Sequence, residues 1–441
     1  MNEGLGSEID VADTIDSSPI GPFQRHVVLM CAAVLFADGF DTQAIGYVAP
    51  ELTRLWHISR PALGPVFSAG LFGLMIGALL FSPVADRIGR KRIIVLSTAW
   101  FALGTLATVL ATDTSTLIGI RFLTGLGLGG AMPNAVALTA EFSPHRRRAT
   151  LVMLAFCGFS VGAALGGLIA AALVPSYGWR SVFVVGGLAP LVLVPVLARS
   201  LPESIRFLTL RGAHDEVAAL LSRIAPGGPA GAVFRLREER PRGIAVLRLF
   251  DRGRALATFL IWIVFFMSLL DLYFLSNWLP TVLSDLGASV SAAALISAML
   301  QVGGFVAVLA LGGVMDRFSF AGLALTYGAA AVAIALVGQS GHSVVTATAA
   351  IFAAGFCVVG AQTAANALVA AYYPTLLRST GVGWALGIGR IGSIVGPLLG
   401  GMLLTMRWPS ADLFLVAAVP ALIAAAAAAG LWRLMPSGVV R

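Results

Sequence analysis

The chain has 441 residues, of which 58% are hydrophobic and 11% charged, and its formal net charge is +8. Soluble domains carry about 25% charged residues, so the composition excludes a single soluble domain and indicates a membrane protein. The three cysteines, Cys31, Cys157 and Cys357, lie far apart in apolar segments. This placement predicts packing roles and neither a disulfide framework nor a metal site.

The chain begins with a polar, acidic segment that contains Glu3, Glu8, Asp10, Asp13 and Asp16. It lacks the basic region and the short apolar run of a signal peptide. We therefore expect residues 1–24 to form a cytoplasmic tail that is not cleaved.

Twelve apolar runs of about 20 residues follow, the length that crosses a bilayer as a helix. They are predicted at 27–48, 62–85, 93–112, 116–140, 150–174, 180–199, 256–280, 290–313, 319–339, 345–371, 380–405 and 412–433. A long polar stretch containing Ala-Pro-Gly-Gly-Pro separates the first six spans from the last six. The sequence predicts an all-α membrane protein with six-helix bundles at 25–202 and 255–434, a cytoplasmic linker with a short helix at 203–254 and a cytoplasmic tail at 435–441.

The first span contains two aspartates, Asp38 and Asp41, in an otherwise uncharged stretch. A charge near the bilayer centre costs about 2.5 to 3.5 kcal/mol on insertion scales, so two on one segment indicate a function. Their i, i+3 spacing places them on one helix face. That face is expected to line a polar cavity, where a carboxylate can bind a cation, exchange a proton or pair with an arginine.

Positive charge is concentrated in the loops after even-numbered spans: Arg87, Arg90, Lys91 and Arg92 after span 2, Arg146–Arg148 after span 4, and the arginines of the linker. Positive loops stay in the cytoplasm, so both termini of this multi-pass protein are expected there, with the spans in the cell (inner) membrane. The net charge is explained by topology and lipid headgroups, and not by nucleic-acid binding.

The two halves of the sequence resemble each other. Asp86-Arg87 recurs as Asp316-Arg317, and Arg148-Ala149-Thr150 recurs as Arg378-Ser379-Thr380. Val161–Gly167 in span 5 likewise parallels Val395–Gly401 in span 11. Six spans bring each copy in from the same side, which predicts parallel repeats that can rock about a central site.

The segment Asp86-Arg87-Ile88-Gly89-Arg90-Lys91 resembles the signature of the major facilitator superfamily between spans 2 and 3, although Ser82 stands where the pattern usually has glycine. The second copy keeps Gly312 but lacks the Gly-Arg-Lys end. The resemblance implies a transporter rather than an enzyme, working by alternating access. A carboxylate beside arginines can hold one gate state, and the alternative is a positive-inside anchor. The gating candidates are Asp86, Arg87, Gly89, Arg90, Lys91, Glu141, Arg148, Asp316, Arg317 and Arg378.

Within the superfamily, the chain resembles the aromatic acid:proton symporters. The resemblance is carried by Asp38-Gly39-Phe40-Asp41, Asn277-Trp278-Leu279-Pro280-Thr281, Tyr373–Trp384 and Gly387–Gly392. It implies import of a benzoate-like or hydroxybenzoate-like acid with a proton, driven by the proton gradient and with no cofactor. The expected partners are that aromatic carboxylate, protons and membrane lipid.

The proposed proton site consists of Asp41, which carries the coupled proton, with Asp38 assisting and Arg121 as the ionic partner. Arg121 lies near the outer end of span 4, at a depth where it can reach both aspartates. A neighbouring arginine lowers the proton affinity of an aspartate and burial raises it, so proton binding can be coupled to whether the pair is intact. The alternative is a static buried ion pair.

Arg390 is the candidate for binding the substrate carboxylate, since a guanidinium can offer it two parallel hydrogen bonds. The alternative is a buried pair with Asp271 or Glu141. Further candidates for the binding site supply amides or aromatic rings, although each ring is more often a packing or interfacial residue. They are Gln362, Asn366, Tyr47, Tyr273, Trp278, Trp384, Asn134 and Gln301.

Other functions are disfavoured by the sequence. Gly387, Gly389 and Gly392 match a dinucleotide motif in spelling, but no strand precedes them, and Lys91 is the only lysine, so no phosphate-binding loop for ATP exists. A proton-coupled exporter of drugs or metabolites is an alternative, weakened because Ala163 and not proline follows Gly162. A symporter of a neutral solute such as a sugar is the other alternative.

Overall fold

The computed structural model describes residues 8–225, 233–235, 246–251, 253–339, 343–406, 408–409 and 412–434. Twelve helices in this part of the chain are long and apolar enough to cross a membrane, and each overlaps one predicted span, so the protein is a multi-pass membrane protein. The predicted spans 93–112 and 290–313 extend past the ends of their helices, at Leu110 and Ala310. The first half comprises α2(Pro22–Trp56), α3(Leu63–Ile88), α4(Arg90–Ala107), α5(Thr114–Glu141), α6(Arg148–Tyr177) and α7(Arg180–Ser200). The second comprises α10(Ala255–Asp285), α11(Val290–Ala310), α12(Gly312–Gln339), α13(Val344–Tyr372), α14(Thr375–Thr405) and α15(Asp412–Leu434).

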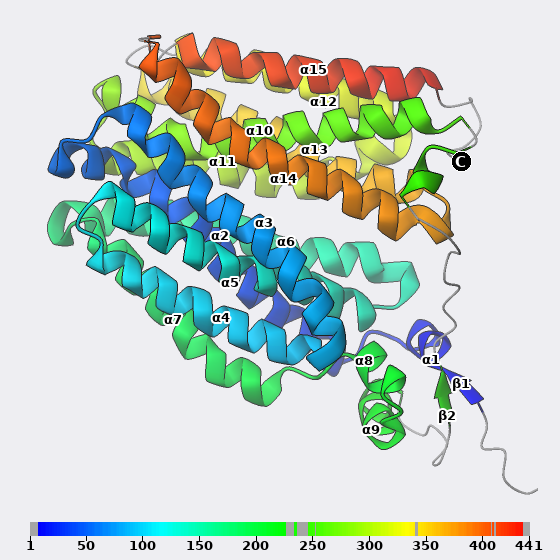
Figure 1. Cartoon of the computed structure of the whole chain (residues 1–441). Helices are drawn as coiled ribbons and strands as arrows, with labels where there is room; N and C mark the ends of the chain where they lie inside the picture. The colour runs from blue at the N-terminus through cyan, green and yellow to red at the C-terminus, as the bar shows by residue number, and fades with distance from the viewer. Residues whose placement is uncertain are drawn as a thin grey trace, which may run out of the picture.

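Short elements complete the chain. The tail forms β1(Glu8–Asp10) and α1(Val11–Ser17), and the linker forms α8(Ile205–Leu210), α9(His214–Ile224) and β2(Val233–Arg235). Single 3-10 turns are η1(Arg60–Ala62), η2(Thr108–Leu110), η3(His145–Arg147) and η4(Leu247–Leu249). We call the side of the molecule at which α2 begins and α15 ends the linker side (Figure 1).

Local signals in the sequence account for where the helices begin and end. Asp113 caps α5 by accepting a hydrogen bond from the Thr116 N–H (2.9 Å), which holds the pKa of this exposed carboxyl below its usual range. Gly89 ends α3 with φ at 105°, in the left-handed region that favours glycine. A Cβ on Gly89 would also overlap the carboxylate of Glu203 and displace that side chain.

The duplication expected from the sequence is visible in the packing. Gly162 of α6 lies against the carbonyl of Phe36 in α2, and Gly396 of α14 lies against the carbonyl of Leu270 in α10. A Cβ at either glycine would overlap that backbone, so these helix pairs approach as closely as small residues allow. The two halves are thus parallel repeats of one six-helix unit.

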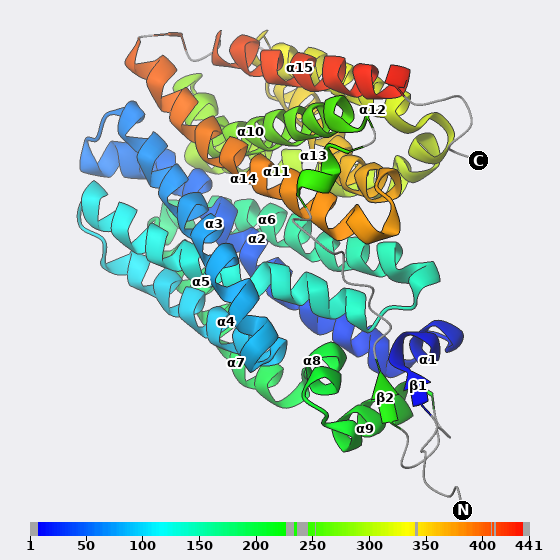
Figure 2. The ribbon, with the colours of Figure 1, turned by 45° about the vertical axis from the view of Figure 1, so that its right-hand side comes forward.

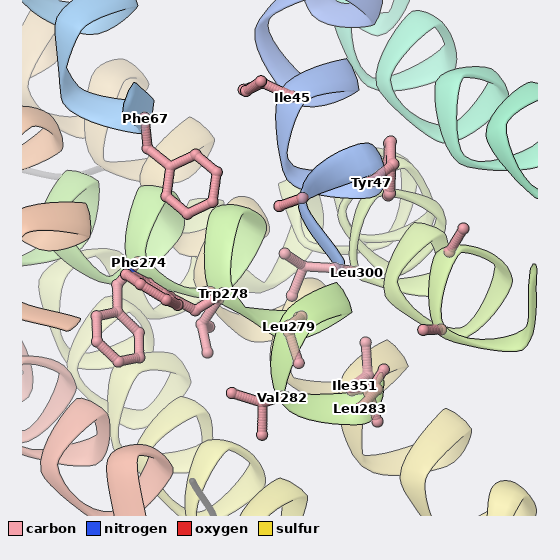
Figure 3. Close-up of a cluster of buried hydrophobic side chains, with 14 of the residues drawn as sticks. Ile45, Tyr47, Phe67, Phe274, Trp278, Leu279, Val282, Leu283, Leu300 and Ile351 are labelled. Carbon is pink, nitrogen blue, oxygen red and sulfur yellow. The ribbon is translucent and has the colours of Figure 1, made fainter. Parts of the chain in front are cut away.

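One hydrophobic cluster joins the halves on the side opposite the linker. It includes Tyr47 and Phe67 from the first half and Trp278, Leu300 and Ile351 from the second (Figure 3). Phe67 meets the edge of Trp278 with ring centroids 5.3 Å apart, a contact worth about 0.5 to 1.5 kcal/mol beyond its buried area. Towards the linker side, each half has a hydrophobic cluster of its own.

Polar contacts and close backbone approach seal the same side. The Ser68 hydroxyl donates to the Ile394 carbonyl (2.8 Å), and Arg60 forms an ion pair with Asp285 (2.6 Å). Nearer the start of α14, on the same face as Ile394, Gly383 and Gly387 are exposed, and no atom lies within 4 Å of the Cβ that each would carry. The halves therefore touch on one side and separate towards the linker side (Figures 1 and 2).

The tail and the linker pack on the first half, and both contain structure where the sequence analysis expected a plain tail and a loop with one short helix. Ile9 pairs with Phe234 in a parallel β1–β2 ladder, while Val11 and Ile15 are buried in the cluster of the first half. Asp16 accepts a hydrogen bond from the backbone N–H of His145 (2.5 Å), which ties the tail to the α5–α6 loop.

The repeat relationship leads to a prediction at Ser319. Asp316 corresponds to Asp86, so Ser319 corresponds to Gly89, and it keeps a positive φ of 48° inside α12. Serine is strained in this conformation, so Ser319→Gly should raise the free energy of unfolding by about 1 kcal/mol. Thermal unfolding in detergent, followed by tryptophan fluorescence, measures the gain.

Ser222→Gly, a change within the ordinary helix α9, is the matched control and should destabilise the protein. An unchanged or lower melting temperature for Ser319→Gly would show that this backbone is not strained.

Candidate functional site

A buried ion pair lies within the first half. Arg121 of α5 donates from Nη1 to both carboxylate oxygens of Asp41 (3.1 and 2.9 Å) and from Nη2 to the Asp41 carbonyl (3.2 Å). The Thr105 hydroxyl of α4 donates to the same carboxylate (2.6 Å). Asp41 is 0% and Arg121 3% exposed. The structure thus brings together the two residues paired by the sequence analysis, whereas Thr105, a hydroxyl in an apolar span, gave no sequence signal.

Asp38 lies one turn nearer the linker side on the same face of α2. Its Oδ1 accepts a hydrogen bond from the Thr42 hydroxyl (2.9 Å), while its buried Oδ2 has no partner among the residues described. Asp38 is also close enough to Arg390 for the two charges to interact, and it lies near the Tyr273 side chain. It therefore lies between the ion pair of the first half and the polar groups of the second.

Arg390 of α14 has no carboxylate partner within the described part of the chain. Its Nη1 donates to the Tyr273 hydroxyl (3.3 Å), and its Nη2 lies against the sulfur of Met132 in the first half (3.4 Å). The suggested alternative partners are placed elsewhere: Glu141 binds Arg90, and the buried Asp271 leaves its Oδ1 without a hydrogen bond. A partly exposed guanidinium that faces the other half can bind an external anion.

A narrow cavity lies next to these charges, between the two halves. Its volume is only about 10 Å³, and it is bounded by residues of α2, α3, α5 and α10. Its lining residues are Thr42, Ile45, Phe67, Gly70, Leu71, Leu74, Arg121, Leu128 and Asn277. The cavity thus reaches the ion pair from the interface.

The predicted aromatic residues have different surroundings. The Tyr47 hydroxyl donates to the Ala163 carbonyl (3.0 Å), and the Trp278 indole donates to the Pro397 carbonyl (3.0 Å), so both tie helices together inside the shared hydrophobic cluster. Trp384 is 44% exposed and stacks on Trp262. Tyr273 is the one of the four that contacts Arg390.

The predicted amides also divide into two groups. Asn134 donates to the Gly130 carbonyl (2.8 Å) within α5, and Gln301 donates to the Ser276 hydroxyl (3.5 Å). Gln362 and Asn366 of α13 each have a buried side-chain oxygen that no described residue hydrogen-bonds. These two carbonyl oxygens are open to a donor, and their role in binding stays a prediction.

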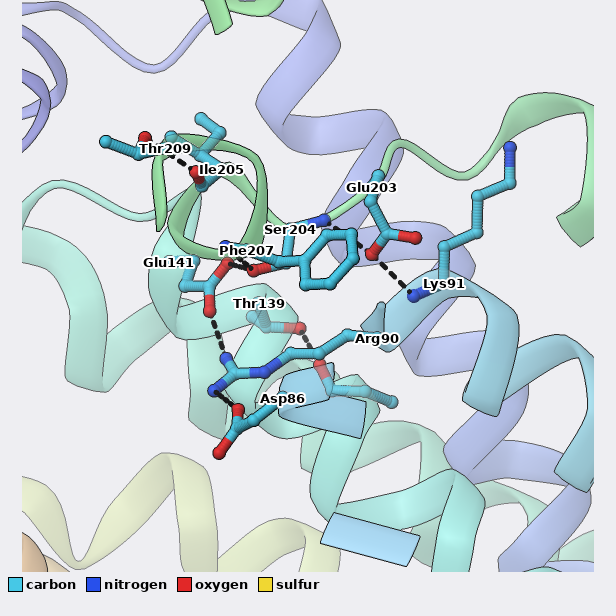
Figure 4. A network of polar contacts seen from close by, with 11 residues as sticks. Asp86, Arg90, Lys91, Thr139, Glu141, Glu203, Ser204, Ile205, Phe207 and Thr209 are labelled. Atoms are coloured by element: carbon cyan, nitrogen blue, oxygen red, sulfur yellow. Dashed lines mark hydrogen bonds and ion pairs between the residues drawn. The ribbon is translucent and has the colours of Figure 1, made fainter. Parts of the chain in front are cut away.

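On the linker side, a network of charges ties α3, α4, α5 and α8 together (Figure 4). Arg90 forms ion pairs with Glu141 and with Asp86. Glu141 accepts the Ser204 hydroxyl (2.6 Å), and Glu203 accepts the backbone N–H of Lys91 (3.0 Å). Four gating candidates, Asp86, Arg90, Lys91 and Glu141, meet here, and Glu203 and Ser204 were not predicted from the sequence.

The remaining gating candidates are arranged differently. Arg87 is exposed, and the Nε atoms of Arg148 and Arg378 are buried and have no hydrogen-bond partner in the part of the chain that the structure describes. Arg317 lies over the Phe318 ring at 5.3 Å. The side chain of Asp316 lies outside the described atoms, so the gating role of the second copy stays a prediction.

The two repeats differ at the polar centre. The glycine contacts between α6 and α2 match those between α14 and α10, and this match places Leu275 of α10 at the position of Asp41 in α2. The matching glycine contacts of α5 and α13 place Ile351 at the position of Arg121. Both are fully buried apolar residues. The same alignment places Gly39 and Phe156 at the positions of Tyr273 and Arg390. Each half thus has one polar pair that the other lacks.

Comparisons with known proteins agree with this architecture. The sequence profile of the Major Facilitator Superfamily matches residues 31–319 and 261–440. The chain is 43% identical to the 4-hydroxybenzoate transporter PcaK of Pseudomonas aeruginosa, over 95% of each chain. It is 42% identical to a gallate transporter of Pseudomonas putida, over 96% of this chain and 95% of the relative. It is 33% identical to the benzoate transport protein of Acinetobacter baylyi, over 95% and 92%.

Two solved structures share the fold at low identity. The xylose transporter XylE from E. coli, in a partially occluded inward open conformation, matches with a TM-score of 0.74 and 16% identity, over 94% of this chain and 100% of that one. An inward-facing bacterial homologue of the lysosomal transporter Spinster matches with a TM-score of 0.70 and 18% identity, over 94% and 98%. On the family profile and on relatives that span nearly its whole length, this chain belongs to the Major Facilitator Superfamily.

Proposed function

We propose that the protein is a secondary active transporter that imports an aromatic carboxylic acid together with a proton by alternating access. The observation that carries this proposal is Arg390, a guanidinium between the halves that pairs with no carboxylate among the described residues and lies beside the buried acids of α2. The relatives that carry 4-hydroxybenzoate, gallate and benzoate by name support an aromatic acid as the substrate.

Arg390 and Tyr273 form the site for the substrate carboxylate. A guanidinium can give a carboxylate two parallel hydrogen bonds, and the Tyr273 hydroxyl can add a third. The Met132 sulfur that now contacts Arg390 is a weak acceptor, so a carboxylate displaces it at little cost. A neutral solute would leave the charge of Arg390 without compensation in a largely apolar setting, which disfavours a sugar as the substrate.

The Asp41–Arg121 pair is the site of the coupled proton. Proton binding to Asp41 removes the charge that holds Arg121, so protonation loosens the contact between α2 and α5. Asp38 connects this site with the substrate, because it interacts with the charge of Arg390. A substrate carboxylate on Arg390 adds negative charge beside Asp38 and so favours entry of a proton on α2.

The structure suits one state of an alternating cycle. The contacts between Ser68 and Ile394 and between Arg60 and Asp285 close one side, while the halves are apart on the linker side. The arginines of the even-numbered loops lie on the linker side, so we assign that side and both termini to the cytoplasm. The protein is then in an inward-open state in the inner membrane, and the Arg90–Glu141 network stabilises the linker-side end of the first half.

The proposal as a whole is tested by uptake into proteoliposomes with an inward proton gradient. Benzoate, 4-hydroxybenzoate, protocatechuate and gentisate form the panel, each with and without a protonophore. Gradient-driven, protonophore-sensitive accumulation of at least one acid is expected. Failure of purified, folded protein across the panel would refute the proposal and favour an exporter or a carrier of neutral solutes.

Asp41→Asn should abolish accumulation of substrate against its gradient, because the amide cannot carry the proton. Counterflow exchange, which needs no net proton movement, should continue. Asp113→Asn is the control, because Asp113 is an exposed helix cap outside the spans. If Asp41→Asn still concentrates substrate, the proton site lies elsewhere.

Arg390→Gln should raise the half-saturating substrate concentration at least about 30-fold, the cost of removing one member of a desolvated charge pair. Arg390→Lys should retain part of the affinity, since it keeps the charge but loses the two-pronged geometry. Uptake as a function of substrate concentration measures both. Equal affinity for the wild type and Arg390→Gln would show that the carboxylate binds elsewhere.

A further inference from the structure

The narrow cavity lies one helical turn beyond the site proposed for the substrate carboxylate. Asn277 follows Tyr273 by four residues on α10, and Thr42 follows Asp38 by four residues on α2. Four residues rise about 6 Å along a helix. The polar side chains of the cavity thus lie about 6 Å deeper between the halves than Tyr273, which is comparable with the length of a para-substituted benzene ring.

An apolar wall connects the two levels. Leu71 packs with Tyr273 and Leu269 beside the carboxylate site, and it also lines the cavity. Leu74 and Leu128 continue this wall, and Phe67 and Ile45 lie among the lining residues. A flat aromatic ring can lie against such leucine side chains with its long axis directed from Arg390 into the cavity.

The deep end of the cavity is polar. Arg121 lines it and has a buried Nε that no group in the described residues accepts, although the side chain is only 3% exposed. The Asn277 amide donates to the Tyr273 carbonyl (2.7 Å), and among the described residues no donor reaches its oxygen. Thr42 uses its hydroxyl proton on Asp38, so its oxygen can accept. The residues that carry one donor and two acceptors thus line a space with room for roughly one water-sized group.

We infer that this cavity is a subsite for a hydroxyl group at the para position of the substrate ring. This inference rests on the proposed function, because Arg390 and Tyr273 must hold the carboxylate at the other end. The phenolic oxygen accepts a hydrogen bond from Arg121 Nε, and the phenolic proton is donated to Asn277 or Thr42. The space is too narrow for the ring itself, and a meta hydroxyl on the same ring would point at the leucine wall.

Selectivity follows from the buried polar groups. A site built to hydrogen-bond a hydroxyl rejects an analogue that lacks it, because its donors and acceptors are then left without partners. The ligand pair that isolates this effect is 4-hydroxybenzoate and 4-methylbenzoate, which have nearly the same shape. The protein should therefore prefer acids with a para hydroxyl over benzoate and over gentisate, which has none.

The experiment measures inhibition of 4-hydroxybenzoate counterflow by 4-methylbenzoate, 3-hydroxybenzoate and unlabelled 4-hydroxybenzoate. The wild type should bind 4-hydroxybenzoate at least tenfold more tightly than either analogue. Asn277→Leu, which keeps the volume and removes the amide, should reduce this preference at least tenfold while it leaves the affinity for 4-methylbenzoate unchanged or higher.

Thr281→Val is the matched control, because Thr281 is buried one turn further along α10 and does not line the cavity. Its preference should equal that of the wild type. Equal affinity of the wild type for 4-hydroxybenzoate and 4-methylbenzoate overturns the subsite, and so does an equal loss for both acids in Asn277→Leu. Transport of benzoates without a para preference would overturn the subsite alone, whereas failure to transport any benzoate would overturn the proposed function as well.

Discussion

A charge inside a bilayer has to be compensated within the protein, because no water is at hand to do it, and the centre of this protein meets that requirement in three unequal ways. Asp41 is fully compensated by Arg121 and Thr105. Asp38 is compensated on one oxygen only. Arg390 contacts a phenol and a thioether, and within the described residues it forms no ion pair with a carboxylate. The incomplete compensation of the last two leaves room for a proton and an anion to complete the set, and this ties binding of one to binding of the other.

The duplicated fold separates these tasks between its halves. The pair Asp41–Arg121 belongs to the first repeat, where its counterparts in the second are Leu275 and Ile351. The pair Tyr273–Arg390 belongs to the second. Because equivalent positions carry different residues, the two similar bundles have different roles: the first holds a titratable acid and the second a fixed cation. Since the halves meet around both, movement of one against the other changes the distance between them.

Much of this arrangement follows from sequence rules, and the reasons for the rest are physical. Intramembrane charges are so costly that Asp38, Asp41, Arg121 and Arg390 stand out in the sequence. The grouping of Asp38, Asp41 and Arg121 could be expected from the positions of the residues in their spans, whereas the placement of Arg390 beside Asp38 could not. Thr105 and Met132 could not be found this way, because hydroxyls and thioethers are common in apolar spans and only the packing of helices selects which of them meets a charge. The aromatic candidates show the converse, since Tyr47 and Trp278 make good packing residues and the sequence alone could not separate that use from substrate contact.

The pairing of β1 with β2 sets an order of assembly. The tail strand Glu8–Asp10 is made first, but its partner Val233–Arg235 leaves the ribosome only after all six helices of the first half. The tail must therefore wait through the insertion of those helices before it can pack, and its hydrogen bond to the α5–α6 loop then joins the beginning of the half to its middle. Because domains fold as units during synthesis, the first half can be complete and fastened before the second has entered the membrane.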